Sequence, residues 1–286
     1  MLRFPARFFI KMKGKGNSTM GPVRRWGQGP YSVAVIHGGP GAPGEVAPVA
    51  RELSTARGVL EPFQTSPTLD GQVQELREVL ASEGTAPFAL IGFSYGAVLS
   101  YLCAARYPEL VRTLILVGCP PFEERYAARI TETRLSRLSP EQRLDAQEFE
   151  RKLADPGGKD KHEILSRLGM LMAQADTYDS IQAENEMLHC QYDIYQPVWD
   201  EVRRLRQSGT LLRMGGRIAC PVLALHGDYD PHPVEGVREP LSRVIRFFRC
   251  ITLKKCGHRP WIEREAIDPF YSVLIREIGT RGEPLL

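Results

Sequence analysis

The sequence predicts an α/β protein with a mostly parallel, doubly wound sheet and an inserted helical segment. Two observations predict the sheet: short runs rich in Val, Ile and Leu alternate with helical patterns, and Gly or Pro stands at the joints. The runs are apolar almost throughout, as expected for strands of a parallel sheet that is covered on both faces. A third observation predicts the insertion, because this alternation stops after Cys119 and resumes at Pro221.

The predicted strands are short apolar runs, each bounded by a turn. They cover residues 31–39, 58–63, 87–94, 111–119, 221–228 and 250–257. After the second run, apolar residues from Leu69 to Leu80 recur at three- and four-residue spacing, which predicts an amphipathic helix ended by Gly84. A more apolar helix is predicted from Gly96 until Pro108 stops it. Strands that alternate with helices favour right-handed crossovers.

The segment 120–217 is predicted to be a helical cap, inserted between the core segments 1–119 and 218–286. It contains charged, leucine-punctuated stretches and no convincing strand. The tetrapeptide Ser-Pro-Glu-Gln at 139–142 offers an N-cap serine, a proline at the first helical position and a capping-box glutamine. Because the insertion follows a core strand, we expect it to cover the carboxyl ends of the strands, where such sheets bind ligands.

Composition excludes several classes of protein. Hydrophobic residues make up 43% and charged residues 25% of the 286 residues, as in ordinary globular chains, so neither a disordered protein nor a membrane span is expected. The formal net charge of +3 is too small to predict nucleic-acid binding. We therefore expect a small-molecule substrate as the partner, and the oligomeric state stays open.

The first 44 residues hold seven basic residues and no acidic one. This composition fits an import presequence, a lipid-contacting arm or a basic β-hairpin, and we favour the hairpin because the apolar run is too short for a secretory signal. The six cysteines form no Cys-x-x-Cys pair, and several lie in apolar segments. We interpret them as reduced thiols of a cytoplasmic protein.

Ser94 lies in Gly-Phe-Ser-Tyr-Gly, between a predicted strand and a predicted helix. Gly92 and Gly96 leave space where a strand that reverses sharply into a helix brings two stretches of backbone together. Such a turn exposes the serine hydroxyl above the sheet, and the helix N-terminus directs its N–H groups at an anion that forms there. The arrangement predicts a nucleophile, with an ordinary turn serine as the alternative.

A serine nucleophile needs a base, and the base needs an acid to orient it. His258 follows the last predicted strand, and Asp230 follows the strand before it. Asp228 is the alternative acid. Carbonyl attack also needs N–H donors for the developing oxyanion, and we assign these to Gly39, in the glycine-rich loop after the first strand, and to Tyr95.

The remaining histidines are assigned structural places. His37 and His226 each precede a glycine at a strand end, where we expect them to be packed and hydrogen-bonded to backbone, and His232 either lines the pocket or is exposed. No pair of histidines has the spacing of a helical metal site such as His-Glu-x-x-His. We therefore expect neither a metal nor a cofactor.

The motifs "HGGPG", "GFSYGA", "HGDYDPHP" and "CGHRPWIE" together resemble the α/β-hydrolase superfamily, in particular its capped, proline-iminopeptidase-like branch. The resemblance extends from about residue 21 to the end of the chain. It implies the α/β-hydrolase fold, the chain order of Ser94 as nucleophile, Asp230 as acid and His258 as base, and an oxyanion hole of backbone amides.

Two departures weaken the peptidase interpretation. Tyr95 stands where proline iminopeptidases usually have tryptophan, and "EPFQTSPT" replaces their Asp-Gln-Arg-Gly turn. Their cap acids grip the amino group of the substrate, and the resemblance offers Glu184 and Glu186 as possible counterparts. The cap stripe around these acids is mostly expected to pack on the core, with one or two aromatics facing the cleft. The expected substrate-binding residues are Glu184, Glu186, Tyr192, Trp199 and Trp261.

The expected function is that of a serine hydrolase that cleaves a small carbonyl ester, amide or thioester through an acyl-enzyme. A proline-iminopeptidase-type aminopeptidase is one alternative. A ligand-binding relative of the same fold without turnover is another. A cofactor-free perhydrolase or lyase with the same triad is a third, because the fold alone does not decide the chemistry.

Overall fold

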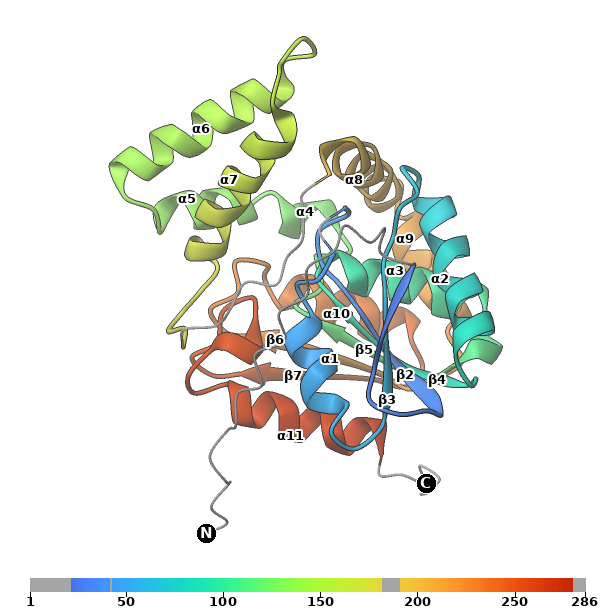
Figure 1. The fold of residues 1–286 in the computed structure, drawn as a ribbon. Coiled ribbons are helices and arrows are strands. Elements are labelled where there is room, and N and C mark those ends of the chain that lie inside the picture. The colour runs from blue at the N-terminus through green and yellow to red at the C-terminus, as the bar shows by residue number, and fades with distance from the viewer. Residues whose placement is uncertain (1–21, 42, 182–190, 280–286) are drawn as a thin grey trace, which may run out of the picture.

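The computed structural model describes residues 22–41, 43–181 and 191–279. Within these residues one sheet of seven strands has the order β1-β3-β2-β4-β5-β6-β7 (Figure 1). All the predicted strands are present and pair in parallel, which confirms the predicted fold class. They are β2 (Tyr31–Ile36), β3 (Gly58–Pro62), β4 (Phe88–Phe93), β5 (Val111–Val117), β6 (Val222–Gly227) and β7 (Phe248–Leu253).

β1 (Val23–Trp26) is the part of the basic N-terminal stretch that precedes β2 in the described chain, and the hairpin favoured for this stretch stays a prediction for residues 1–21. This strand pairs antiparallel with β3, and β3 separates it from β2, so β1 and β2 form no hairpin. Arg24 of β1 contacts the buried carboxylate of Glu61 at 3.3 Å, and Trp26 donates to the same carboxylate at 2.9 Å. Part of the basic stretch is thus an edge strand, and residues 1–21 lie outside the described part of the chain.

Helices cover both faces of the sheet (Figure 1). On one face lie α1 (Ala47–Leu53) and α11 (Ile267–Ile278), and on the other lie α2 (Leu69–Glu83), α3 (Tyr95–Arg106) and α10 (Glu235–Val244). Side chains of β4 alternate between the two layers: Ile91 packs in the first and Leu90 in the second. Apolar residues are needed at every position of such a strand, which explains the unbroken apolar runs. Short 3₁₀ helices lie at Pro108–Leu110, Gly215–Arg217 and Pro260–Ile262.

Between β5 and β6 the described chain contains helices and no strand of the sheet. At the start of α6, Ser139 and Gln142 form the predicted capping box. The helices are α4 (Glu124–Ala127), α5 (Ile130–Ser136), α6 (Pro140–Ala154), α7 (Lys161–Ala175), α8 (Tyr192–Gln207) and α9 (Thr210–Met214).

The inserted helices divide into two groups by their packing. Residues between α5 and α7 form a small cluster of their own around Leu138, Ala146 and Ala175. In Figure 1, α5, α6 and α7 project away from the sheet. In contrast, α8 and α9 join the main core through residues such as Val198 and Leu211. The insertion is therefore partly an extension of the core.

No helix in the described ranges combines the length and the apolar character needed to cross a membrane. The cysteines that the structure describes are free thiols: Cys103, Cys119, Cys220, Cys250 and Cys256.

Candidate active site

Ser94 stands at the sharp turn between β4 and α3. Its backbone has φ 51° and ψ −118°, a positive φ that costs a non-glycine residue about 1–3 kcal/mol. A Cβ on Gly92 would lie 2.6 Å from the Cα of Ala97, and a Cβ on Gly96 would collide with the carbonyl oxygens of residues 36 and 37. Both glycines are therefore required by close backbone approach, and the turn holds the serine at the carboxyl edge of the sheet.

Asp230 and His258 come together from the loops after β6 and β7. The imidazole Nδ1 of His258 donates to Oδ2 of Asp230 at 2.7 Å, and both residues are buried. Asp228, the alternative acid, is exposed and accepts a hydrogen bond from the amide of Cys256 at 3.2 Å. Of the two candidate acids, the structure thus brings Asp230 to the histidine.

The electrostatics of this pair favour a charged acid and a basic imidazole. Burial would raise the pKa of Asp230, but the neighbouring imidazoles, His258 foremost, hold it well below its usual value. Burial would lower the pKa of His258, but the charge and hydrogen bond of Asp230 outweigh this effect and raise it. Because ionised Asp230 can only accept hydrogen bonds, Nδ1 of His258 carries the proton and Nε2 is left to act as a base.

Ser94 and His258 share their immediate surroundings. The amide of Ser94 donates to the carbonyl of Val117 at 2.9 Å, and the next residue, Gly118, lies under the imidazole: a Cβ there would be 2.9 Å from Nδ1 of His258. The ring of Phe93 packs against the same imidazole, with the two ring centroids 4.8 Å apart and the planes tilted by 49°. No hydrogen bond joins the Ser94 hydroxyl to His258, both of which the structure describes. Nucleophile–base hydrogen bonds are often loose without a bound substrate.

The two amides assigned to the oxyanion hole lie in adjoining segments. Gly39 follows β2 with φ 44°, and Tyr95 is the first residue of α3. Neither amide donates to another residue within the described part of the chain. The side chain of Tyr95 points elsewhere, because its hydroxyl donates to the Gln72 amide oxygen at 2.5 Å in the core. Both N–H groups are thus unpaired within the described chain, and their assignment to an oxyanion hole stays a prediction.

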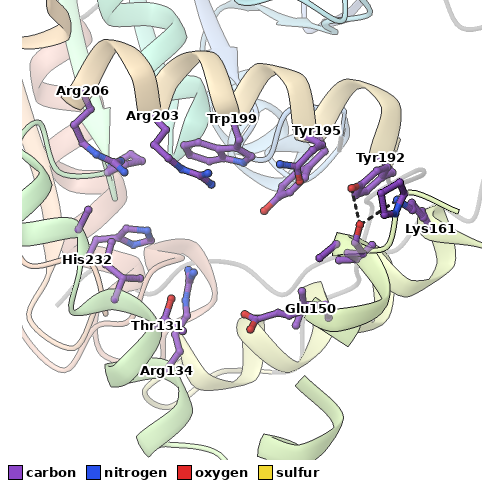
Figure 2. A pocket seen from close by; sticks show the side chains of 18 residues that line it. Thr131, Arg134, Glu150, Lys161, Tyr192, Tyr195, Trp199, Arg203, Arg206 and His232 are labelled. Carbon is purple, nitrogen blue, oxygen red and sulfur yellow. Dashed lines mark hydrogen bonds between the residues drawn. The ribbon is translucent and has the colours of Figure 1, made fainter. Parts of the chain in front are cut away.

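A cavity of about 690 Å³ lies between the inserted helices and the core (Figure 2). One face of α8 forms its roof, since side chains at helical spacing along this face point into it, with Gln196 beside them. The side chains at this spacing are Tyr192, Tyr195, Trp199, Arg203 and Arg206. The opposite wall is made by residues of α5 and α6, including Arg134 and Glu150, and His232 lies at the end nearest the strands.

Two of the expected substrate-binding residues line the cavity, and a third does not. Tyr192 and Trp199 line the cavity. Trp261 does not: it is 5% exposed and packs edge-on against Phe93 at 4.6 Å in the layer of α11, which corrects the expectation. Trp261 lies in the 3₁₀ helix Pro260–Ile262, and this turn directs its side chain into the core between the sheet and α11. Glu184 and Glu186 lie outside the described residues.

A comparison with known families matches residues 23–269 to the Alpha/beta hydrolase family. The chain belongs to this family. The resemblance drawn from the four motifs is therefore confirmed at the level of the superfamily, and the predicted α/β-hydrolase fold is confirmed with it.

Known proteins share the fold of this α/β hydrolase at low sequence identity. VinJ is 20% identical, with a TM-score of 0.61 over 90% of this chain and 93% of that one. Proline iminopeptidase from Mycobacterium smegmatis is 18% identical, with a TM-score of 0.57 over 88% and 92%. Ethanol acetyltransferase 1 from Cyberlindnera fabianii is 33% identical over 57 residues, which are 20% of this chain and 17% of that protein's length. The two structural likenesses concern the fold alone.

His232 is a part of this α/β-hydrolase site that sequence reasoning left undecided. Its Nδ1 donates to Oδ1 of Asp230 at 2.8 Å, its amide donates to the same oxygen at 2.9 Å, and its ring lies 4.6 Å from that of His258. His226 lies beneath and donates from Nε2 to the carbonyl of His232 at 2.7 Å. His37 is likewise buried and hydrogen-bonded to backbone, as expected for both. Asp230 thus holds two imidazoles with its two carboxylate oxygens.

Glu263 is a buried carboxylate that the sequence analysis missed. Its oxygens accept backbone N–H groups from Tyr178 at 2.9 Å, Asp179 at 2.7 Å and Gly257 at 3.0 Å. Gly257 immediately precedes His258, so Glu263 ties the loop of the base to the segment that follows α7. Glu263 stands at the end of "CGHRPWIE", but nothing in the sequence indicates that it accepts N–H groups from Tyr178 and Asp179, 85 and 84 positions away.

A second contact joins the inserted helices to the same loop. The amide of His258 donates to the carbonyl of Asp176 at 2.8 Å. The carboxylate of Asp176 in turn accepts two hydrogen bonds from Arg134 of α5, at 2.7 and 2.5 Å. The backbone around His258 is thus held by the segment that follows α7 on one side and by Glu263 on the other.

Replacing Glu263 by glutamine is expected to destabilise the protein by about 2–4 kcal/mol, because one of its two acceptor oxygens becomes a donor that faces backbone N–H groups. Urea unfolding of wild type and Glu263→Gln measures the change. Glu265→Gln is the matched control, since Glu265 is exposed and pairs only with Lys255 on the surface. Equal stability of the two variants would contradict the positioning role.

Asp230, His232 and His258 also satisfy the geometric criterion for a metal site, because one ligand atom of each lies within 4.8 Å of the others. Their observed contacts of 2.7 and 2.8 Å are hydrogen bonds between imidazole N–H groups and a carboxylate. An ion would have to replace both protons. The absence of a metal and of a cofactor stays a prediction.

Proposed function

We propose that this α/β hydrolase is a serine hydrolase that cleaves a small carbonyl ester, amide or thioester through an acyl-enzyme. The observation that carries the proposal is the 2.7 Å contact between His258 and Asp230 at the strand edge where Ser94 is held with φ 51°. A strained backbone at a buried acid–base pair is typical of a functional site. The inserted helices would serve as the cap over this site.

In the proposed mechanism, Nε2 of His258 takes the proton of Ser94 as its Oγ attacks the carbonyl carbon. Asp230 holds Nδ1–H and stabilises the imidazolium that forms. The amides of Gly39 and Tyr95 donate to the oxyanion, each contributing about 3 kcal/mol. The imidazolium then protonates the leaving group, and a water activated by the same base releases the acyl group.

The rate is expected to depend on pH through His258. Only the neutral imidazole accepts the proton, so kcat/KM should fall as the pH drops through the pKa of His258. Because Asp230 raises that pKa, the midpoint of the acidic limb should lie above about 6.5, the ordinary value of a histidine. Initial rates on one ester between about pH 5 and 9 test this. A rate that does not change over this range would contradict the assignment of the base.

The cavity favours neutral or anionic substrates over those with a free amino group. Four basic side chains line it, and Glu150 is the one acidic side chain in the described lining. Three of the four basic side chains are paired with carboxylates: Arg134 with Asp176, Arg203 with Asp200 and Arg206 with Glu124. An ammonium group would still find only the carboxylate of Glu150 in the described lining, so the aminopeptidase alternative receives less support than the esterase one.

A substrate panel tests the proposal. Purified protein is offered p-nitrophenyl esters and aminoacyl-naphthylamides, and a fluorophosphonate probe is applied in parallel. Turnover of the esters with covalent labelling of Ser94 supports the serine hydrolase. Turnover of proline naphthylamide in place of the esters would indicate the aminopeptidase, and absence of both turnover and labelling would indicate a ligand-binding relative.

A further inference from the structure

His232 has no task in the proposed mechanism, although its donors occupy one of the two carboxylate oxygens of Asp230. It is 7% exposed, and it lines the cavity on the side nearest the strands. Figure 2 shows its imidazole at the cavity wall, below Arg203 and Arg206 of α8. A surface histidine or a packing histidine would not need this position.

The hydrogen bonds of His232 determine which ring nitrogen carries a proton. Ionised Asp230 can only accept, so Nδ1 of His232 must donate to it. Burial lowers the pKa of His232 to about 4, although Asp230 opposes this effect, so the ring is neutral near pH 7. A neutral ring with Nδ1–H has a lone pair on Nε2. No hydrogen bond to Nε2 is found within the described residues.

The lone pair is therefore an acceptor on the wall of a cavity whose other polar groups are mostly donors. The guanidinium groups of Arg134, Arg203 and Arg206 line the same space. An ammonium donor would find one carboxylate, that of Glu150, in the described lining, and this leaves an uncharged hydroxyl or amide N–H as the group that fits Nε2.

We propose that His232 is a substrate-binding residue whose Nε2 accepts a hydrogen bond from a hydroxyl or amide N–H of the substrate near the scissile carbonyl. The inference rests on the proposed function, because Ser94 and His258 define where that carbonyl lies. The rings of His232 and His258 are 4.6 Å apart and tilted by 31°. A donor that reaches His232 must therefore lie within a few bonds of the carbonyl that His258 serves.

Pairs of esters with the same shape test whether a substrate hydroxyl donates a hydrogen bond to His232. Each pair exchanges a hydroxyl for a methyl group: ethyl 2-hydroxybutanoate with ethyl 2-methylbutanoate, ethyl 3-hydroxybutanoate with ethyl 3-methylbutanoate, and 2-hydroxyethyl with propyl butanoate. Binding is measured by ligand-observed NMR titration on the Ser94→Ala variant, which removes turnover. We expect at least one hydroxylated ester to bind roughly five- to tenfold more tightly than its partner, the effect of one net hydrogen bond.

Two variants of His232 each retain the function of only one of the two ring nitrogens. In His232→Asn the amide nitrogen takes the place of Nδ1 and still donates to Asp230, but no acceptor reaches the cavity. In His232→Gln the amide oxygen takes the place of Nε2, and the bond to Asp230 is lost. Combined with Ser94→Ala, the first should abolish the hydroxyl preference and the second should retain it. In the Ser94 enzyme, kcat/KM ratios of the ester pairs should follow the same order.

Equal binding of every pair to the Ser94→Ala protein would overturn the proposal, and so would any other ranking of the two variants. These binding measurements do not depend on turnover. Fluorophosphonate labelling of the wild type reports separately on the serine nucleophile. A hydroxyl preference without labelling would support His232 as a binding residue and refute the serine hydrolase. Labelling without a hydroxyl preference would support the serine hydrolase and refute the role of His232.

Discussion

Replacing Ser94 by alanine is expected to lower kcat by about 10⁵-fold or more on any ester that the wild type hydrolyses, because no other group supplies the attacking oxygen. The fold should persist, since Ser94 contributes no side-chain hydrogen bond to the cap of α3. Stopped assays on the best ester of the panel measure the loss, and circular dichroism with urea unfolding verifies that the variant is folded. Fluorophosphonate labelling should disappear together with turnover.

Ser100 offers the matched control in the same helix. Its hydroxyl is buried and has no hydrogen-bond partner among the described residues, so Ser100→Ala should retain both activity and stability. Ser94→Gly provides a second check: glycine tolerates the φ of 51°, and this variant should be inactive but more stable than Ser94→Ala by about 1 kcal/mol. Turnover that survives in either Ser94 variant would show that the nucleophile lies elsewhere.

The sheet could be predicted because its strands carry a local signal. Each parallel strand is buried on both faces and is therefore apolar throughout, and each ends at a turn. β1 has no such signal: its four residues, Val-Arg-Arg-Trp, lie at the edge of the sheet. Arg24 pairs with the buried Glu61 of β3 and Arg25 with Glu83 at the end of α2, and both acids come from segments far along the chain.

The meeting of Asp230 and His258 could be predicted because each follows a recognisable strand, and parallel strands bring their carboxyl ends to one edge. Their role with Ser94 as a catalytic triad stays a proposal.

The contacts that hold these side chains in place could not be predicted from the sequence. His232 bonds to Asp230 only two residues away, but the ring of His258 that it faces comes from another loop. Glu263 accepts from Gly257 nearby and from Tyr178 and Asp179, 85 and 84 positions away, and a single sequence does not reveal which distant amides a buried carboxylate will meet. Trp261 shows a different outcome: it was expected to bind substrate, but it lies in a 3₁₀ turn and packs in the core layer of α11.

Replacing Asp230 by asparagine is expected to lower kcat by about 10⁴-fold, the size of loss known for this change in a serine-protease triad. The carboxylate accepts Nδ1–H of His258 on one oxygen and two donors of His232 on the other. An amide has one oxygen, so its NH₂ group must face one of the imidazoles. If it faces His258, Nδ1 becomes the acceptor, the proton moves to Nε2, and the base can no longer take a proton from Ser94.

Asp228→Asn is the control for this variant, because Asp228 is two residues away, is exposed and bonds to the amide of Cys256 with one oxygen that asparagine keeps. It should retain kcat within about threefold. The pH profile adds a second measurement. Without the negative charge that raises its pKa, His258 should become less basic, and the acidic limb of the residual Asp230→Asn activity should move to lower pH. A larger loss in Asp228→Asn than in Asp230→Asn would transfer the role of the acid to Asp228. An acidic limb at the same pH in both proteins would mean that residue 230 does not raise the pKa of the base.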